Sequence, residues 1–156
     1  MSCKDRLEKY LRDNGVAFQV QHHARVFTAL EVAAAEHVPG KQLVKVVMTV
    51  ADGKAVMLAL PASYWVDRTK AAAVMGVTDV RLAAEQEFAA TFPDCEVGAM
   101  PPFGNLYGMP VYVADSLTED EEIAFNAGSH TQLVKMSYRD FERLVQPRVM
   151  HFGVNV

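Results

Sequence analysis

LVKVVMTVADGKAVMLAL, residues 43 to 60, consists of two apolar runs on either side of Asp52-Gly53. Asp-Gly between such runs is a strong signal for a two-residue β-hairpin turn. The sequence therefore predicts that residues 43 to 51 pair with residues 54 to 60. Both faces of the first strand are mostly apolar, which is typical of a central strand that is covered on both sides.

Short helices and further strands are expected on both sides of this hairpin. Helical periodicity and capping residues predict helices over residues 3–13, 28–37, 67–76 and 83–91, and a last helix that opens at 137–140. The second of these begins with a capping box at Thr28. Strands are expected at 18–20, 111–113, 123–125 and 133–136. The acidic run 119–122 is expected to be a solvated hairpin tip.

Helices interspersed among hairpin-linked strands predict the fold class. We expect an α+β domain with a mixed, largely antiparallel sheet, curled or closed toward a barrel, and surrounded by short helices. A doubly wound nucleotide-binding fold has less support, because neither glycine-rich phosphate-binding motif occurs in the sequence.

Composition predicts one domain, residues 1–156, in a reducing cytoplasm. The chain has 156 residues, 51% of them hydrophobic, which allows a sizeable core. Its net charge of −4 argues against broad, salt-dependent binding to nucleic acid backbones. Cys3 and Cys95 are too few for a disulfide framework. No apolar run approaches the roughly 20 residues that span a bilayer.

Lys45 is the only charged residue in the run from Leu43 to Val50. An ammonium group is costly to bury without a partner. Either its stem snorkels to a nearby edge, or the strand delivers a positive charge into a cleft. Periodicity alone favours the first explanation.

Two further segments could contribute to a site. The loop Gly98 to Gly104 contains two prolines, which restrict the backbone and either make a rigid turn or leave peptide groups for a ligand. The segment from Asn126 to His130 is a turn of small residues that ends in a titratable imidazole. Taken alone, His130 is more typical of a surface or capping histidine.

Metal and nucleophile chemistry have little support. The adjacent residues His22 and His23 would point to opposite faces of a strand, and no acidic residue has ligand spacing to them. The acidic neighbours Asp94 and Glu96 disfavour a thiolate at Cys95, so we expect this cysteine to be incidental.

With these elements in view, the chain resembles the YbaK family, the free-standing relatives of the editing domain inserted in bacterial prolyl-tRNA synthetases. The resemblance rests on the order and spacing of four segments between residues 5 and 145. These are Val44-Lys45 after Pro39-Gly40, Gly98-Ala99-Met100-Pro101-Pro102-Phe103-Gly104, Val111 to Leu117, and Phe125 to His130. The second segment is similar to the G-x-x-x-P loop of that family, with Ala99 in place of its usual second glycine.

The resemblance implies hydrolysis of the ester that joins a wrong amino acid to tRNA, with no metal or organic cofactor. It implies that Lys45 is the catalytic lysine, which holds the phosphate of the terminal adenosine or polarises the ester. It also implies substrate-binding residues in the proline loop, in the Gly-Ser-His turn and in the pocket wall: Gly98, Ala99, Pro102, Gly128, Ser129, His130 and Thr28.

The partner implied by the resemblance is the acceptor end of an aminoacyl-tRNA, and an aminoacyl-tRNA synthetase could be a second partner. Neither a membrane nor DNA is expected. Two other functions remain open at this point. The first is a catalytically inactive module that binds an aminoacyl-adenosine-like ligand, which would show saturable binding without turnover. The second is a regulatory protein, in which pocket substitutions would have no effect.

Overall fold

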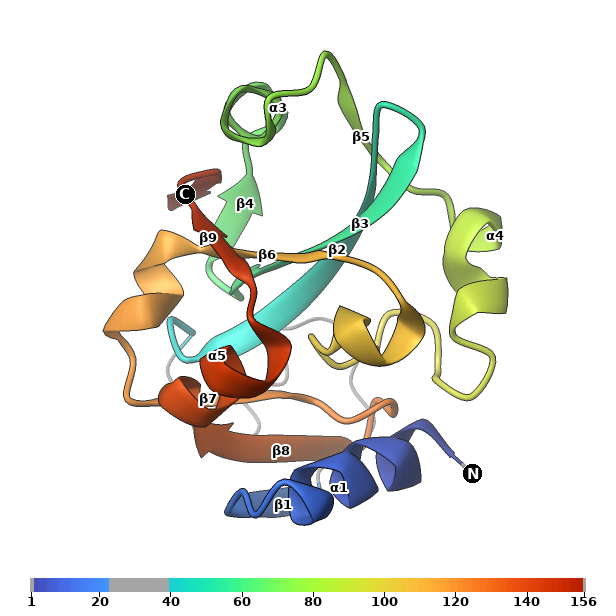
Figure 1. Ribbon diagram of the computed structural model, residues 1–156, viewed down its shortest axis with the longest axis vertical. Coiled ribbons are helices and arrows are strands. Elements are labelled where there is room, and N and C mark those ends of the chain that lie inside the picture. The colour runs from blue at the N-terminus through green and yellow to red at the C-terminus, as the bar shows by residue number, and fades with distance from the viewer. Residues whose placement is uncertain (1, 23–39, 156) are drawn as a thin grey trace.

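The computed structural model describes residues 2–22 and 40–155 (Figure 1). The elements in these ranges follow one another in this order: α1 (Cys3–Asp13), β1 (Phe18–His22), β2 (Leu43–Ala51), β3 (Lys54–Pro61), β4 (Tyr64–Val66), α3 (Arg68–Met75), β5 (Val80–Leu82), α4 (Glu85–Phe88), η1 (Ala89–Thr91), η2 (Gly104–Tyr107), β6 (Val111–Ala114), η3 (Asp115–Glu119), β7 (Glu122–Asn126), β8 (Gln132–Ser137), α5 (Tyr138–Val145), β9 (Arg148–Met150) and β10 (Gly153–Asn155).

A large mixed sheet forms the centre of the fold. Its strand order is β1-β8-β7-β2-β3-β6-β9, and β5 also pairs with β2. The pairings β1–β8, β7–β8, β2–β3 and β2–β5 are antiparallel, whereas β2–β7, β3–β6 and β6–β9 are parallel. In Figure 1, β2 and β3 cross the centre, with α1 on one side of them and α3 on the other. The predicted α+β class is confirmed.

The β2–β3 hairpin forms as expected and occupies the middle of the sheet. Its register runs from Val44 opposite Pro61 to Ala51 opposite Lys54. At the tip, Asp52 and Gly53 both adopt positive φ angles, 47° and 85°, as a tight hairpin turn requires. The strand β2 lies between β7 and β3, so the prediction of a central strand is confirmed.

The capping residues define the helix ends where the sequence predicts them. The side chain of Asp67 accepts a hydrogen bond from the Lys70 N–H at 3.0 Å, and α3 ends at Gly76 with a φ of 69°. The side chain of Ser137 caps α5 in the same way. The predicted helix over 83–91 is shorter and continues as η1, and the predicted helix over 28–37 lies outside the described residues. None of the helices in the described ranges is long and apolar enough to cross a membrane.

The prediction of a hairpin around the acidic run 119–122 is wrong. The strand β6 pairs in parallel with β3, and β7 pairs in parallel with β2, so β6 and β7 lie on opposite sides of the central hairpin. Both strands bury apolar residues in one core, including Val113 and Phe125. These non-local contacts outweigh the local turn signal, and η3 begins the connection between the two strands.

Two apolar clusters include residues from opposite faces of β2. Val44 and Met48 belong to the larger cluster, together with Phe125. Ala51 belongs to the smaller cluster, and Val47 packs against it. This alternation is the one expected from the period of a strand, and it places Lys45 on the same face of the sheet as Val47.

Candidate functional site

Lys45 carries a positive charge that the described part of the molecule does not neutralise. It lies opposite the fully buried Leu60 and is itself partly buried. This burial lowers the pKa of the ammonium group. Among the residues that the structure describes, no carboxylate forms an ion pair with Lys45. Its Nζ lies 4.8 Å from the ring centroid of Trp65. A partly desolvated cation is suited to receive an anionic or carbonyl oxygen from a ligand.

Asn126 ends β7 beside Lys45. The parallel register pairs Leu43 with Ala124 and Val44 with Phe125, so the next positions are Lys45 and Asn126, on the same face of the sheet. The Oδ1 atom of Asn126 is buried and accepts no hydrogen bond within the described ranges. An unsatisfied buried acceptor costs about 1 to 3 kcal/mol. This face therefore offers a cation and a hydrogen-bond acceptor next to each other.

The proline loop and the histidine turn are joined by backbone hydrogen bonds. The Gly128 N–H donates to the Ala99 carbonyl at 2.8 Å, and the Glu96 N–H donates to the Gly128 carbonyl at 2.8 Å. The His130 N–H donates to the Glu96 carboxylate at 2.9 Å. At Gly98, which has a φ of +82°, an added Cβ would lie 3.6 Å from Cε1 of His130. The structure thus brings Gly98, Ala99, Gly128 and His130 together.

The imidazole of His130 is part of this junction. His130 is 5% exposed, and its Nε2 lies 2.7 Å from the Val97 carbonyl oxygen. A carbonyl oxygen can only accept, so Nε2 carries the proton and donates it to this bond. Of the two settings predicted for His130, surface or capping, the surface one is wrong, because the side chain is buried against a backbone carbonyl. Its observed contacts hold the backbone at Val97 and Gly98.

Pro102 belongs to the anchored half of the loop. Pro101 and Pro102 are both buried. The next residue, Phe103, packs against Phe125, with their ring centroids 5.5 Å apart. Gly98, in contrast, is exposed. The exposed part of the loop is therefore its beginning, and its proline half fixes the loop to the core.

The remaining predicted residues are Ser129 and Thr28. The Ser129 hydroxyl lies within hydrogen-bond distance, 2.8 Å, of the Thr131 hydroxyl, and it accepts from the Thr131 N–H at 3.1 Å. This arrangement is a local turn contact. Thr28 lies outside the described residues, so the structure gives it no position.

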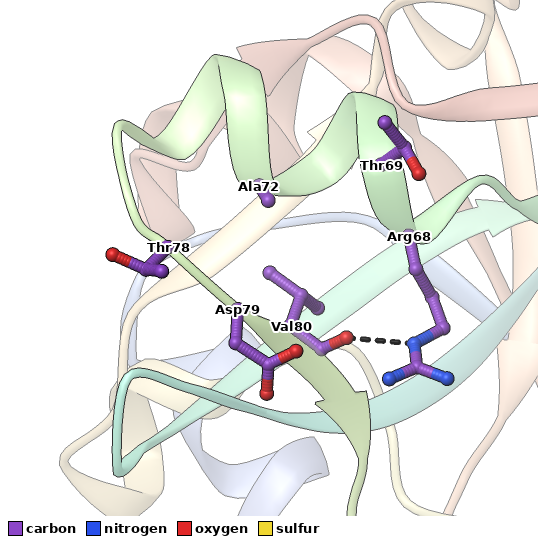
Figure 2. Close-up of a pocket in the computed structure, with 6 residues that line it drawn as sticks. All are labelled: Arg68, Thr69, Ala72, Thr78, Asp79 and Val80. Carbon is purple, nitrogen blue, oxygen red and sulfur yellow. Dashed lines mark hydrogen bonds between the residues drawn. The ribbon is translucent and has the colours of Figure 1, made fainter.

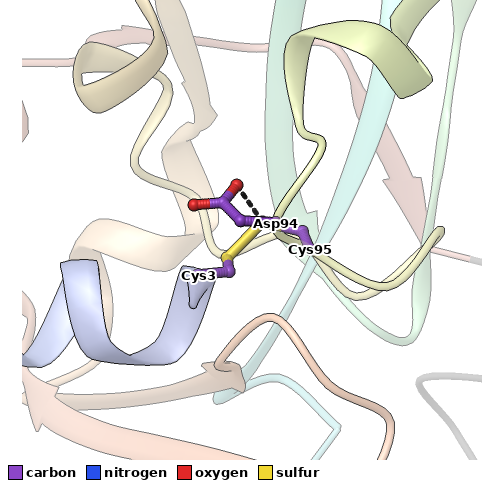
Figure 3. A group of neighbouring side chains, drawn as sticks. All are labelled: Cys3, Asp94 and Cys95. Atoms are coloured by element: carbon purple, nitrogen blue, oxygen red, sulfur yellow. Dashed lines mark hydrogen bonds between the residues drawn. A yellow bond between two sulfur atoms is a disulfide. The ribbon is translucent and has the colours of Figure 1, made fainter. Parts of the chain in front are cut away.

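Cys3 and Cys95 form a disulfide bond (Figure 3). It joins the start of α1 to the residue before Glu96, and the Cys3 N–H also donates to the Asp94 carbonyl at 3.1 Å. The expectation that Cys95 is incidental is wrong, because the fold brings together two cysteines that are 92 positions apart. Disulfides are more usual in oxidising compartments than in the reducing cytoplasm that the sequence predicts.

Asp94 lies beside the disulfide, and its carboxylate is held by neighbours of its own. Arg6 forms an ion pair with it at 3.3 Å, and the Tyr107 hydroxyl donates to it at 3.3 Å. Burial, followed by the negative charge of Asp94, raises the pKa of Tyr107 to about 12. The two sulfurs and a carboxylate oxygen of Asp94 lie within 4.8 Å of one another, and no other metal-ligand group occurs in the part of the chain that is described. Disulfide sulfurs are not thiolate ligands, so this group does not form a metal site.

Gly128 provides a test of the close packing around the disulfide. A Cβ at Gly128 would lie 2.5 Å from the Cys3 sulfur, whereas a Cβ at Gly15 would meet nothing within 4 Å, and both residues have positive φ. We expect Gly15→Ala to lower the free energy of unfolding by about 1 to 2 kcal/mol, the cost of the backbone conformation. Gly128→Ala should lower it by roughly 1 to 3 kcal/mol more, because of the overlap. If urea denaturation showed the same loss of unfolding free energy for both variants, the close approach of Gly128 to the Cys3 sulfur would be contradicted.

Two surface hollows lie elsewhere on the described molecule. The first, of about 340 Å³, lies between α3 and β5 and is shown in Figure 2. Its Arg68 is engaged through Nε with the Val80 carbonyl at 2.7 Å. The second, of about 690 Å³, adjoins the start of α5 and is lined by Glu119, Asp120, Glu121 and Glu142, among others. Its acidic lining disfavours a phosphate ligand. None of the predicted site residues with a described position lines either hollow.

Comparison with known proteins identifies the family. Residues 23–144 match the family model described as an aminoacyl-tRNA editing domain. The chain belongs to this family. A search of curated proteins gave no match.

Solved structures show that the fold of this editing-domain protein is shared. One, described as "a putative trans-editing enzyme for prolyl tRNA synthetase", superposes with a TM-score of 0.85 at 22% identity, over 99% of this chain and 98% of that chain. A hypothetical protein, APE2540, gives a TM-score of 0.85 at 19% identity, over 95% of this chain and 99% of that chain. A chain from Marinobacter aquaeolei VT8, described as "a Putative signal transduction protein", gives 0.73 at 18% identity, over 95% of this chain and 30% of that chain. The expected resemblance to the YbaK family is confirmed.

Sequence reasoning missed Trp65 and gave no role to Asn126. Trp65 is the only tryptophan of the chain, but its proximity to Lys45 depends on how β4 folds back after β3. Asn126 stands in the turn that the sequence singles out, yet its position beside Lys45 follows only from the parallel β2–β7 register. The composition could have drawn attention to Trp65 as a single tryptophan, whereas the position of Asn126 beside Lys45 required the structure.

Proposed function

We propose that this editing-domain protein hydrolyses the ester bond of mischarged aminoacyl-tRNA. The observation that carries the proposal is the partly buried ammonium group of Lys45 beside the buried Asn126 acceptor, neither of which has a partner among the described residues, in a chain of the editing family. A cation stabilises negative charge on a phosphate or on a carbonyl oxygen, and an amide oxygen accepts a hydrogen bond from a hydroxyl or amino group. An aminoacylated ribose carries all of these groups.

In the proposed reaction a water molecule attacks the ester carbonyl carbon. The negative charge that develops on the carbonyl oxygen is stabilised by Lys45 or by peptide N–H groups, and the bond from the carbonyl carbon to the ribose oxygen then breaks. That oxygen takes up the proton that the water loses, so the products are the amino acid and a tRNA with a free hydroxyl. An ester of this kind is readily hydrolysed, so positioning and electrostatics suffice without a covalent nucleophile.

The proline loop and the histidine turn have a positioning role in this proposal. Gly98 presents its exposed backbone near the substrate, and the buried Ala99 joins the loop to the turn at Gly128. Pro102 fixes the loop to the core, and His130 holds the exposed part of the loop through Val97. Gly128 allows the turn to approach the disulfide closely. Ser129 and Thr28 complete the proposed set of substrate contacts.

The proposed partner is the acceptor end of tRNA, bound by a single editing domain. The net charge of −4 disfavours an extended contact with the tRNA backbone. Affinity would therefore come from the terminal nucleotides or from a synthetase that delivers the tRNA. Selection among amino acids would depend on pocket size, because one methylene changes binding in an apolar pocket by only about 1 to 3 kcal/mol.

A screen of mischarged tRNAs tests the proposal. Purified protein is incubated with each tRNA, and release of the amino acid is compared with the spontaneous rate. We expect rapid discharge of at least one mischarged tRNA. Saturable binding of a non-hydrolysable aminoacyl-adenosine without discharge of any tRNA would instead support the catalytically inactive binding module.

A further inference from the structure

Trp65 is a large apolar side chain that the fold leaves in solvent. It is the middle residue of β4, and its neighbours Tyr64 and Val66 pack against the smaller apolar cluster. Successive strand residues point to opposite sides, so Trp65 points away from that cluster. It is 59% exposed. An indole that only contributed to the core would be covered on both faces.

The position of the ring relative to Lys45 distinguishes Trp65 from the other exposed apolar residues. The Lys45 Nζ lies over the indole, 4.8 Å from the ring centroid. Leu82 is similarly exposed, at 57%, but its aliphatic side chain offers no π-surface. Because more than half of Trp65 is exposed, the ammonium group leaves a large part of the aromatic surface open. The result is an accessible π-surface next to a positive charge that has no ion-pair partner within residues 2–22 and 40–155.

We propose that Trp65 is a stacking platform for the terminal nucleobase of the tRNA acceptor end. The inference rests on the proposed function and names how its substrate is held. A nucleotide combines a flat aromatic base with an anionic phosphate, and Trp65 and Lys45 offer the matching pair of surfaces. Stacking on the indole would leave the ammonium group of Lys45 near the sugar and phosphate of the same nucleotide. Asn126, at the end of β7, then lies beside Lys45 on the ester side of the ligand.

Intrinsic fluorescence provides a direct test, because Trp65 is the only tryptophan. Folded protein is titrated with adenosine 5′-monophosphate and, separately, with ribose 5-phosphate, which has no base. We expect saturable quenching by the nucleotide and a much smaller change with the sugar phosphate. An RNA minihelix with the complete acceptor end should quench at lower concentration than one that lacks the terminal adenosine. Equal responses to both minihelices would overturn the assignment to the terminal base.

Kinetics of deacylation separate the role of Trp65 from that of Lys45. Loss of one stacked base reduces affinity by about 5- to 150-fold. Trp65→Leu should therefore raise KM by that factor and change kcat little, while Trp65→Phe retains most of the affinity. Leu82→Ala, a change at a similarly exposed apolar residue, is the control and should leave KM unchanged.

The outcomes distinguish this inference from the proposed function. An unchanged KM in Trp65→Leu, with activity that is still lost in a Lys45 variant, would overturn the stacking role alone. If the wild-type protein discharges no tRNA, the proposed function fails. In that case base-dependent quenching by adenosine 5′-monophosphate would still support Trp65 as a nucleotide platform, and its absence would overturn it.

Discussion

Reduction of the Cys3–Cys95 disulfide is expected to lower the free energy of unfolding by about 3 to 5 kcal/mol. The bond links residues that are 92 positions apart, so in the unfolded chain it closes a long loop and restricts many conformations. It also ties α1 to the segment that precedes Glu96 and His130. Urea denaturation of oxidised and reduced protein measures the difference, and hydrogen exchange should show faster exchange at residues 95–98 after reduction.

The double variant Cys3→Ser/Cys95→Ser is the matched control for the reductant. It should unfold at the midpoint of the reduced protein and should not respond to reductant. Thiol titration should find no free thiols in the oxidised wild-type protein and two after reduction. The prediction fails if the two forms unfold at the same denaturant concentration while the thiol counts differ.

Replacing Lys45 with alanine is expected to lower kcat/KM for deacylation by about 100- to 1,000-fold, the effect of removing one group that stabilises developing charge. Lys45→Ala removes the cation from the β2 strand and leaves the neighbouring Asn126 acceptor in place. The fold should survive, because Lys45 forms no ion pair with any residue in the described ranges. Circular dichroism and the unfolding midpoint check this point.

The pH dependence of nucleotide binding tests the charge of Lys45 independently. Burial lowers the pKa of Lys45 below its ordinary value of 10.5. If the protonated form binds the phosphate, affinity for adenosine 5′-monophosphate should be present at neutral pH and fall as the pH rises through that lowered value. In Lys45→Arg the guanidinium group stays charged, so the fall should disappear. An identical alkaline fall in both proteins would assign it to another group.

The central hairpin could be predicted because its signals are local. The turn at Asp52-Gly53 and the apolar runs beside it are contiguous in sequence, and so are the caps at Asp67 and Ser137. The three-residue strands β4, β5, β9 and β10 were missed because they are too short for a periodic pattern. The hairpin predicted between β6 and β7 failed because parallel pairing with the central strands depends on contacts that are distant in sequence.

The candidate site was predictable in part for the same reason. Lys45 stands out because a charge interrupts an apolar strand, and the proline loop and the histidine turn stand out by composition. The buried position of His130, in contrast, depends on the Val97 carbonyl, 33 residues before it. The Cys3–Cys95 bond and the contact between Lys45 and Trp65 are also tertiary relations. No spacing rule within one chain segment could reveal them.

A crystal structure with a non-hydrolysable amide analogue of aminoacyl-adenosine tests the proposed site most directly. We predict that the adenine stacks on Trp65, that an oxygen of the ligand lies within hydrogen-bond distance of the Lys45 Nζ, and that a ligand donor meets Asn126 Oδ1. Binding of the analogue in the hollow beside Arg68, or anywhere that leaves Lys45 without a ligand contact, would contradict the proposed site.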